Sequence, residues 1–298
     1  MSLPPLYKYL GVQGAKLTLA NQCFRFAKPS EYDDLEDMTA QSLFKDKLEK
    51  ALPMLSDGFV DAIMANLYAP PTCPPKQRAL VTTLQTFFRA YPERAPIVKE
   101  GLRKDPKKSG MSLEFWKTQS DEFVKETNAF MQTYRVFCVT TDKASPRMWK
   151  EYAKDHQGIA LRITPSVAKE SKYLKFAPVT YQEKRPPIFA KTADFAAESL
   201  FGNQTERARR VLEGIIYAKT NAYKFESEYR LAIPLGEGEE DYRTQPFHPE
   251  EITELYLGAA MTDADKQEII AAAKALNPQI AVFQSKQEKD GRISFDAV

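Results

Sequence analysis

The spacing of apolar and polar residues predicts short strands separated by helices. Alternating stretches predict strands at 6–10, 23–26, 135–141, 159–163, 179–181, 223–233, 252–257 and 279–283, with a turn around Asn21 before the second strand. From 39 to 133, apolar residues such as Leu48, Leu52 and Leu55 recur at helical spacing, which predicts three to five helices. Further helices are predicted after Ser145, over 192–222 and after Thr262.

Because these strands are interrupted by helices rather than alternating strictly with them, the pattern favours an α+β fold with a split, mixed or antiparallel sheet. We expect one α+β domain over residues 1–298, with a large helical insertion at 39–133.

The segment Tyr223–Ile233, YKFESEYRLAI, holds the most polar of these strands. On a strand, Glu226, Glu228 and Arg230 share one face. Because charged groups are costly to bury without partners, that face lines either solvent or a polar cleft. Lys219 and Tyr223 come just before it, one helical turn apart.

Tyrosines at the N-terminus offer a second candidate surface. Tyr7 and Tyr9 share one face of the first strand, and Lys8 points away from it. Two tyrosines on one face can enclose a planar ring or can belong to the core.

An acidic loop follows between Ser30 and Asp37. Asp33 and Asp34 in this loop can ligate a hard cation, or they can cap a helix that begins near Leu35.

An aromatic pair lies on the helix that Ser145 opens. Trp149 and Tyr152 are three residues apart and therefore on one helical face, with His156 one turn further along. Such a face is typical of a helix that packs on a sheet, and His156 fits a structural histidine near a helix end.

Composition narrows the classes of function. The 298 residues are 43% hydrophobic and 28% charged, as in soluble globular proteins, and the net charge of +2 argues against a broad nucleic-acid-coating surface. Three scattered cysteines predict no disulfide framework, and two histidines exclude a three-histidine zinc site. With no signal-like or membrane-spanning segment, we expect a cytoplasmic protein without a membrane partner.

Taken together, four blocks of the chain resemble a bacterial family of unassigned role, domain of unknown function 2971. The resemblance runs from about residue 6 to 258 and skips the helical insertion. The matching positions are Leu6–Tyr9, Phe26, Pro29, Ser30, Tyr32, Asp33, Asp34, Cys138, Trp149, Tyr152, Ala153, His156, Gly158, Lys219, Glu226, Glu228, Tyr229 and Arg230. The chain departs from the family pattern at Asp33, Leu35, Asp37 and Tyr223, which replace Asn, Pro, Glu and Trp.

The order of the blocks also resembles the ADP-ribosyltransferase fold, with an early ring-binding strand and a late strand that bears a catalytic Glu. This resemblance implies NAD as the substrate, Glu228 as the carboxylate that stabilises an oxocarbenium-like state, and Glu226 as the acid that activates the acceptor. The NAD-binding residues it implies are Tyr7, Lys8, Tyr9, Lys28, Ser30, Tyr32, Asp33, Asp34, Trp149, Tyr152 and Arg230.

The leading hypothesis is therefore an NAD-consuming ADP-ribosyltransferase-like enzyme. It would act as a toxin or phage-defence effector on a nucleic acid or a protein. One alternative is a metal-dependent nuclease or phosphoesterase that uses Asp33, Asp34, Glu226 and Glu228. The other is a non-enzymatic binding module with the helical insertion as its partner surface.

Overall fold

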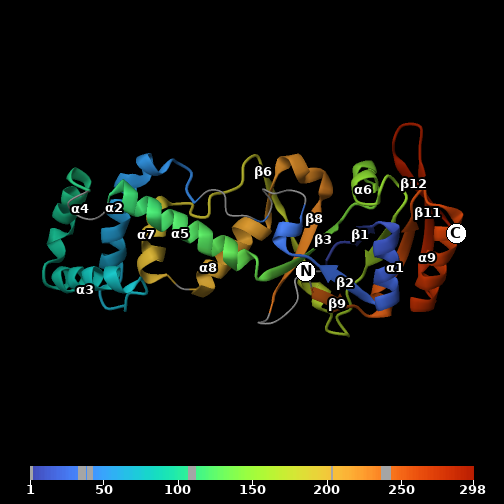
Figure 1. The fold of residues 1–298 in the computed structure, drawn as a ribbon, viewed down its shortest axis with the longest axis horizontal. Helices are drawn as coiled ribbons and strands as arrows, with labels where there is room; N and C mark the ends of the chain where they lie inside the picture. Colours follow the sequence, from blue (N-terminus) through green and yellow to red (C-terminus); the bar gives the residue numbers. More distant parts are fainter. Residues whose placement is uncertain (1–2, 33–37, 39–42, 107–111, 203, 236–242) are drawn as a thin grey trace. The chain divides into compact units, whose positions relative to one another are not determined.

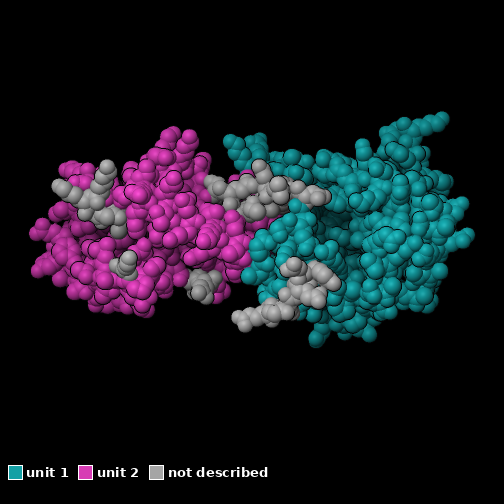
Figure 2. Space-filling model, in the orientation of Figure 1, with its two compact units in different colours: residues 1–35, 132–184, 219–298 teal, residues 36–131, 185–218 magenta. Residues whose placement is uncertain are grey.

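The chain has the mixed α+β fold that the sequence predicts (Figure 1). This computed structural model describes residues 3–32, 38, 43–106, 112–202, 204–235 and 243–298. The chain divides into two compact units, coloured separately in Figure 2. Unit 1 comprises residues 1–35, 132–184 and 219–298, and unit 2 comprises residues 36–131 and 185–218.

A mixed eight-stranded sheet forms the centre of unit 1. Its neighbouring strands are antiparallel, apart from the parallel pair β10–β11. In sheet order the strands are β12 (Ile293–Ala297), β11 (Ala281–Gln287), β10 (Ile252–Leu257), β4 (Ile159–Ile163), β1 (Leu6–Leu10), β3 (Tyr134–Thr140), β8 (Glu228–Pro234) and β5 (Ala177–Pro178). Two small sheets pair β2 (Cys23–Phe26) with β9 (Arg243–Pro246), and β6 (Thr180–Gln182) with β7 (Ala218–Thr220).

One face of the large sheet is apolar. Its Leu161 and Leu255 are fully buried in one cluster with Leu19 of α1 (Val12–Asn21) and Ile269 of α9 (Asp263–Leu276). Figure 1 shows α1 and α9 on this side of unit 1. Alternation along the strands sends the polar residues to the opposite face.

That opposite face carries a row of polar residues across five strands. Directly paired residues of antiparallel strands point to the same side. The pairing therefore aligns Glu228, Thr140, Tyr7, Arg162 and Glu254 in one row. The short helix α6 (Pro146–Glu151) packs on this face, because Trp149 meets Tyr9 edge to face with ring centroids 5.1 Å apart.

Unit 2 is helical within its described residues. It contains α2 (Leu48–Ala65), α3 (Pro75–Ala90), α4 (Ala95–Lys104), α5 (Leu113–Met131), α7 (Thr192–Phe201) and α8 (Gln204–Val211). Phe195 lies at the centre of its core and contacts Phe44, Trp116, Phe123 and Phe189 at ring-centroid distances of 5.3–6.1 Å.

The structure differs from three of the local predictions. Residues 12–21 form α1, which the sequence did not predict, and the turn before β2 follows the end of this helix at Gln22. The long helix over 192–222 is broken into α7, α8 and a π-helical turn, Leu212–Ile216, and the chain then enters β7. The last predicted strand, 279–283, begins at Ala281 and extends to Gln287.

Close packing of α2 against α7 gives a stability prediction. A Cβ at Gly58 would lie 2.7 Å from the Cα of Ala193, whereas a Cβ at Gly101 would meet nothing within 4 Å. We expect Gly58→Ala to lower the free energy of unfolding by about 1–3 kcal/mol through overpacking. Gly101→Ala, in an open helical position, should raise it by roughly 0.5–1 kcal/mol.

Urea unfolding followed by circular dichroism measures both changes. Equal effects of the two substitutions would contradict the close approach of α2 and α7.

Candidate functional site

The segment that carries Glu226 and Glu228 is not a continuous strand, so the prediction over 223–233 was wrong in its first half. Residues Asn221–Glu226 form a 3₁₀ helix, and Ser227 takes a left-handed conformation with φ 43°. The strand β8 starts only at Glu228. The amide of Thr141 donates to the carbonyl of Ser227 at 3.1 Å, which fixes the turn against the end of β3.

Because of this turn, the carboxylates of Glu226 and Glu228 both lie beside the ammonium group of Lys219. The Nζ of Lys219, which enters on β7, lies 2.6 Å from Oε2 of Glu226 and 3.7 Å from Oε2 of Glu228. Arg230 binds Glu228 in a bidentate manner, with Nε to Oε1 at 3.0 Å and Nη2 to Oε2 at 2.8 Å. We call Lys219, Glu226, Glu228 and Arg230 the ion network.

The ion network is almost completely buried. Glu226 is 3% exposed, Lys219 5%, Glu228 7% and Arg230 0%. Its two anions and two cations balance, and charges are tolerated in an interior when they are paired and hydrogen-bonded in this way.

Tyr152 connects the ion network to solvent. Its hydroxyl donates to Oε1 of Glu226 at 2.6 Å, and the residue is 44% exposed. Ser145 caps α6 as predicted, because its Oγ accepts from the amide of Met148 at 3.3 Å. The helix ends at Glu151, so Tyr152 follows its last turn.

Beyond Tyr152 the chain leaves the helix. Lys154, Asp155 and His156 all have positive φ, so His156 does not continue the face of Trp149 and Tyr152 along a helix. Its ring instead stacks on Trp149, with centroids 6.2 Å apart. The nearby Gly158 is required sterically, because a Cβ there would lie 2.1 Å from the carbonyl oxygen of Leu10.

The two carboxyl groups have pKa values shifted in opposite directions. Burial and the nearby negative charge of Glu228 raise the pKa of Glu226, although Lys219 and Tyr152 oppose them. Burial alone would raise the pKa of Glu228, but Arg230 and Lys219 outweigh it and lower that pKa to about 2. Glu228 is therefore an anion at neutral pH, and Glu226 is the carboxyl group that more readily takes up a proton.

Two further groups line Glu228. The backbone amide of Glu228 donates to the hydroxyl of Tyr181 at 2.9 Å. Cys138 pairs with Arg230 across β3 and β8. Burial raises the pKa of the Cys138 thiol, and the negative charge of Glu228 adds to this effect. The Tyr32 hydroxyl lies 3.6 Å from the Cys138 sulfur and donates to the carbonyl of Val136 at 2.8 Å.

The structure brings some of the predicted site residues together and separates others. Glu226, Glu228, Arg230 and Tyr152 meet in or beside the ion network. Tyr7 and Tyr9 are on the same sheet face but are only 6% and 5% exposed, in an aromatic cluster with Trp149. Their burial agrees with the alternative in which these tyrosines belong to the core.

The remaining predicted residues lie elsewhere. Lys8 points to the other sheet face, where its Nζ donates to the Cys138 carbonyl at 2.9 Å and lies 4.9 Å from the Phe137 ring centroid. Lys28 and Ser30 belong to the segment around the 3₁₀ turn Pro29–Glu31. Asp33 and Asp34 lie outside the described residues.

Sequence reasoning gave no role to Lys219 and did not single out Tyr181. Lys219 was expected on a helix, whereas it lies on β7 with its Nζ 4.3 Å from the Tyr223 ring centroid. Tyr181 carries no sequence signal, because only the pairing of distant segments brings it to Glu228.

Comparison with protein families supports the resemblance over one segment of the chain, which includes residues of both units. The model described as "Protein of unknown function (DUF2971)" matches residues 148–231. That range includes Tyr152 and all four residues of the ion network. The family resemblance is thereby confirmed for this part of the chain.

The other comparisons gave no further relatives. No curated protein and no solved structure matched the chain. None of the described helices is long and apolar enough to cross a membrane. Within the described ranges, no three His, Cys, Asp or Glu side chains are grouped as a metal site.

The paired charges predict a pH-dependent effect on stability. Glu228→Gln leaves the buried guanidinium of Arg230 without its anion and should cost about 3–5 kcal/mol of unfolding free energy at pH 7. Because the folded pKa of Glu228 is lowered, its stabilisation is present above the unfolded value of 4.5 and is lost as pH falls toward about 2. The difference between wild type and variant should therefore shrink over that interval.

Chemical unfolding at pH 7, 4 and 3 checks this expectation. Glu100→Gln, which removes the partner of Lys104 on the surface of α4, serves as the control and should change stability little. A pH-independent cost of Glu228→Gln would contradict the ionic role of Glu228.

Proposed function

We propose that the chain is an enzyme that breaks the bond between nicotinamide and ribose in NAD and transfers the ADP-ribosyl group to an acceptor. The observation that carries this proposal is the pair of buried carboxylates on Lys219, with pKa values shifted in opposite directions. Carboxyl groups separated in this way can take different roles in one reaction.

The proposed reaction assigns one role to each carboxylate. As the C1′–N bond breaks, its electron pair leaves with nicotinamide and positive charge develops on the ribose. The anion of Glu228 stabilises that charge electrostatically. An acceptor hydroxyl or amine then attacks C1′, and its proton passes to Glu226, whose raised pKa suits a general base.

Substrate reaches this centre from the Tyr152 side in the proposal. Tyr152 is the half-exposed neighbour of Glu226, so its ring is available to stack on nicotinamide. Tyr7 and Tyr9 support the sheet behind the site instead. The acceptor is a nucleic acid or a protein, in keeping with a toxin or phage-defence effector.

An ADP-ribosyltransferase-like arrangement of unit 1 is part of this proposal. It is supported by the early strand β1 and the late Glu-bearing strand β8, which both pair with β3. The metal-dependent alternative is less well supported, because Lys219 and Arg230 already occupy the positions of cations beside Glu226 and Glu228.

A non-enzymatic binding module is the second candidate function. One observation favours it, namely exposed large apolar side chains on unit 2. Tyr68, Phe87, Tyr91 and Ile97 are 84%, 37%, 53% and 58% exposed. In this alternative the charge-balanced ion network has only a structural role.

Release of nicotinamide from NAD tests the proposal. Wild-type protein, assayed with and without cell extract as a source of acceptor, should release nicotinamide. Glu228→Gln should reduce the rate by roughly a hundredfold or more, since it removes an electrostatic contact made in the transition state. Tyr152→Ala, which removes the proposed stacking ring at a half-exposed position, should reduce the rate without unfolding the protein.

Glu254→Gln is the matched control, because Glu254 is also ion-paired to an arginine, Arg162, on the same face of the same sheet. Circular dichroism establishes that each variant is folded at the assay temperature. Full turnover by folded Glu228→Gln and Tyr152→Ala proteins would refute the assigned roles. A wild type that releases no nicotinamide under either condition would favour the binding-module function.

A further inference from the structure

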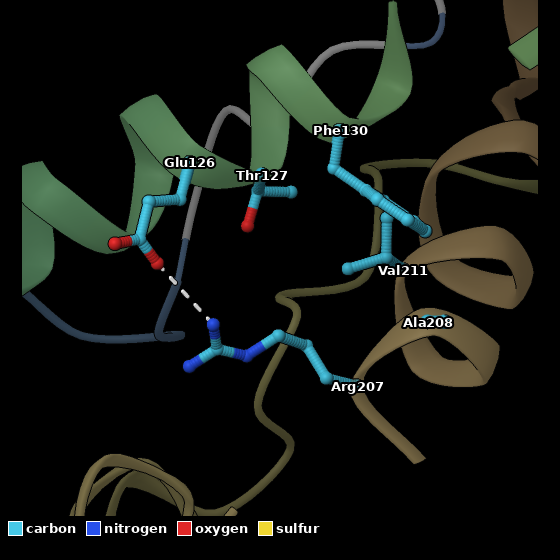
Figure 3. Close-up of a pocket in the computed structure, with 6 residues that line it drawn as sticks. All are labelled: Glu126, Thr127, Phe130, Arg207, Ala208 and Val211. Atoms are coloured by element: carbon cyan, nitrogen blue, oxygen red, sulfur yellow. Dashed lines mark hydrogen bonds and ion pairs between the residues drawn. The ribbon is translucent and has the colours of Figure 1, made fainter. Parts of the chain in front are cut away.

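A cavity in unit 2 has the properties of a small-molecule site. It measures about 300 Å³ and lies between α5 and α8 (Figure 3). It is lined by Glu126, Thr127, Phe130, Arg207, Ala208 and Val211. Ligand pockets in proteins begin at roughly this size and combine apolar walls with a few placed polar groups.

The polar group at this cavity is the guanidinium of Arg207, which is anchored on one side. Its Nε donates to Oε1 of Glu198 at 3.1 Å, and its central carbon lies 4.6 Å from the Phe123 ring centroid. The Glu198 side chain is only 6% exposed and also pairs with Arg210 at 3.3 Å. These contacts hold Arg207 in a fixed orientation.

The other side of the same guanidinium has a weak partner. Nη1 donates to Oε2 of Glu126 at 3.3 Å, the interaction drawn in Figure 3, and the Glu126 side chain is 68% exposed. Exposed ion pairs of this kind contribute little stability. The carboxylate of a ligand can therefore replace that of Glu126 at Nη1, and the Glu126 side chain then rotates into solvent.

Thr127 provides a second polar group at the cavity. The residue is 4% exposed, and Figure 3 shows its hydroxyl on the side of α5 that faces Arg207. A hydroxyl on the cavity wall can donate a hydrogen bond to a ligand atom that lies beside Arg207.

We propose that this cavity binds a small apolar monocarboxylate. One carboxylate oxygen accepts from Nη1 of Arg207 and the other from the Thr127 hydroxyl, while the apolar body packs against Phe130, Ala208 and Val211. This site is independent of the proposed NAD chemistry.

Isothermal titration of the full chain with 4-phenylbutyrate tests the proposal. We expect saturable binding by wild type, and binding weakened by roughly tenfold or more in Arg207→Gln through loss of a charge-assisted hydrogen bond. Arg209→Gln is the matched control and should bind as wild type does, because Arg209 lies on the same helix but pairs with exposed Glu206 and Glu213. The neutral amide 4-phenylbutanamide should bind wild type only weakly. Its affinity for wild type should equal that of 4-phenylbutyrate for Arg207→Gln.

Arg207→Gln removes one of the two cations that neutralise the buried Glu198, and this loss can unfold the protein. Two further variants test the proposal without changing Arg207. Glu126→Gln changes only an exposed side chain and should tighten binding several-fold, because it removes the charge that competes for Nη1. Ala208→Leu fills the cavity and should abolish binding. No binding by folded wild type, or unchanged affinity in folded Ala208→Leu, would overturn the proposal.

Discussion

The buried ion network is the constraint on which the polar side of unit 1 depends. Two carboxylates and two cations lie in a nearly dry environment, so each is tolerated only while the others are present. Lys219 is shared by Glu226 and Glu228, and Arg230 saturates Glu228. The network therefore fixes the relative positions of β7, the 3₁₀ helix and β8, which are separate elements of the chain.

The two faces of the sheet explain why these charges gather where they do. Strand alternation sends aliphatic residues to the side covered by α1 and α9, and directs Glu228, Arg230 and Cys138 to the other side. The short helix α6 covers part of this second face with Trp149 and leaves Tyr152 half exposed beside Glu226. A buried acid with a raised pKa thus has a hydrogen-bonded route to solvent through one phenol.

Unit 2 also contains a buried carboxylate, but its neutralising cations come from a single helix. Its core is aromatic around Phe195, and its buried carboxylate, Glu198, is neutralised by Arg207 and Arg210 from α8. Both guanidinium groups also lie over phenylalanine rings, at 4.6 Å and 4.8 Å from the centroids. Such stacking suits arginine, whose planar, weakly hydrated group accepts apolar contact on its faces.

The sequence by itself determined the α+β class, most strand positions and the caps at Ser145 and Thr262, because these follow from local periodicity and short-range hydrogen bonding. It also singled out Glu226, Glu228 and Arg230. The break at Ser227, the position of Lys219 and the approach of Tyr181 were decided only by tertiary structure. The left-handed Ser227 is held by Thr141 at the end of the distant β3. Lys219 meets both carboxylates because β7 pairs with β6 and β8 pairs with β3, and no local pattern encodes that pairing.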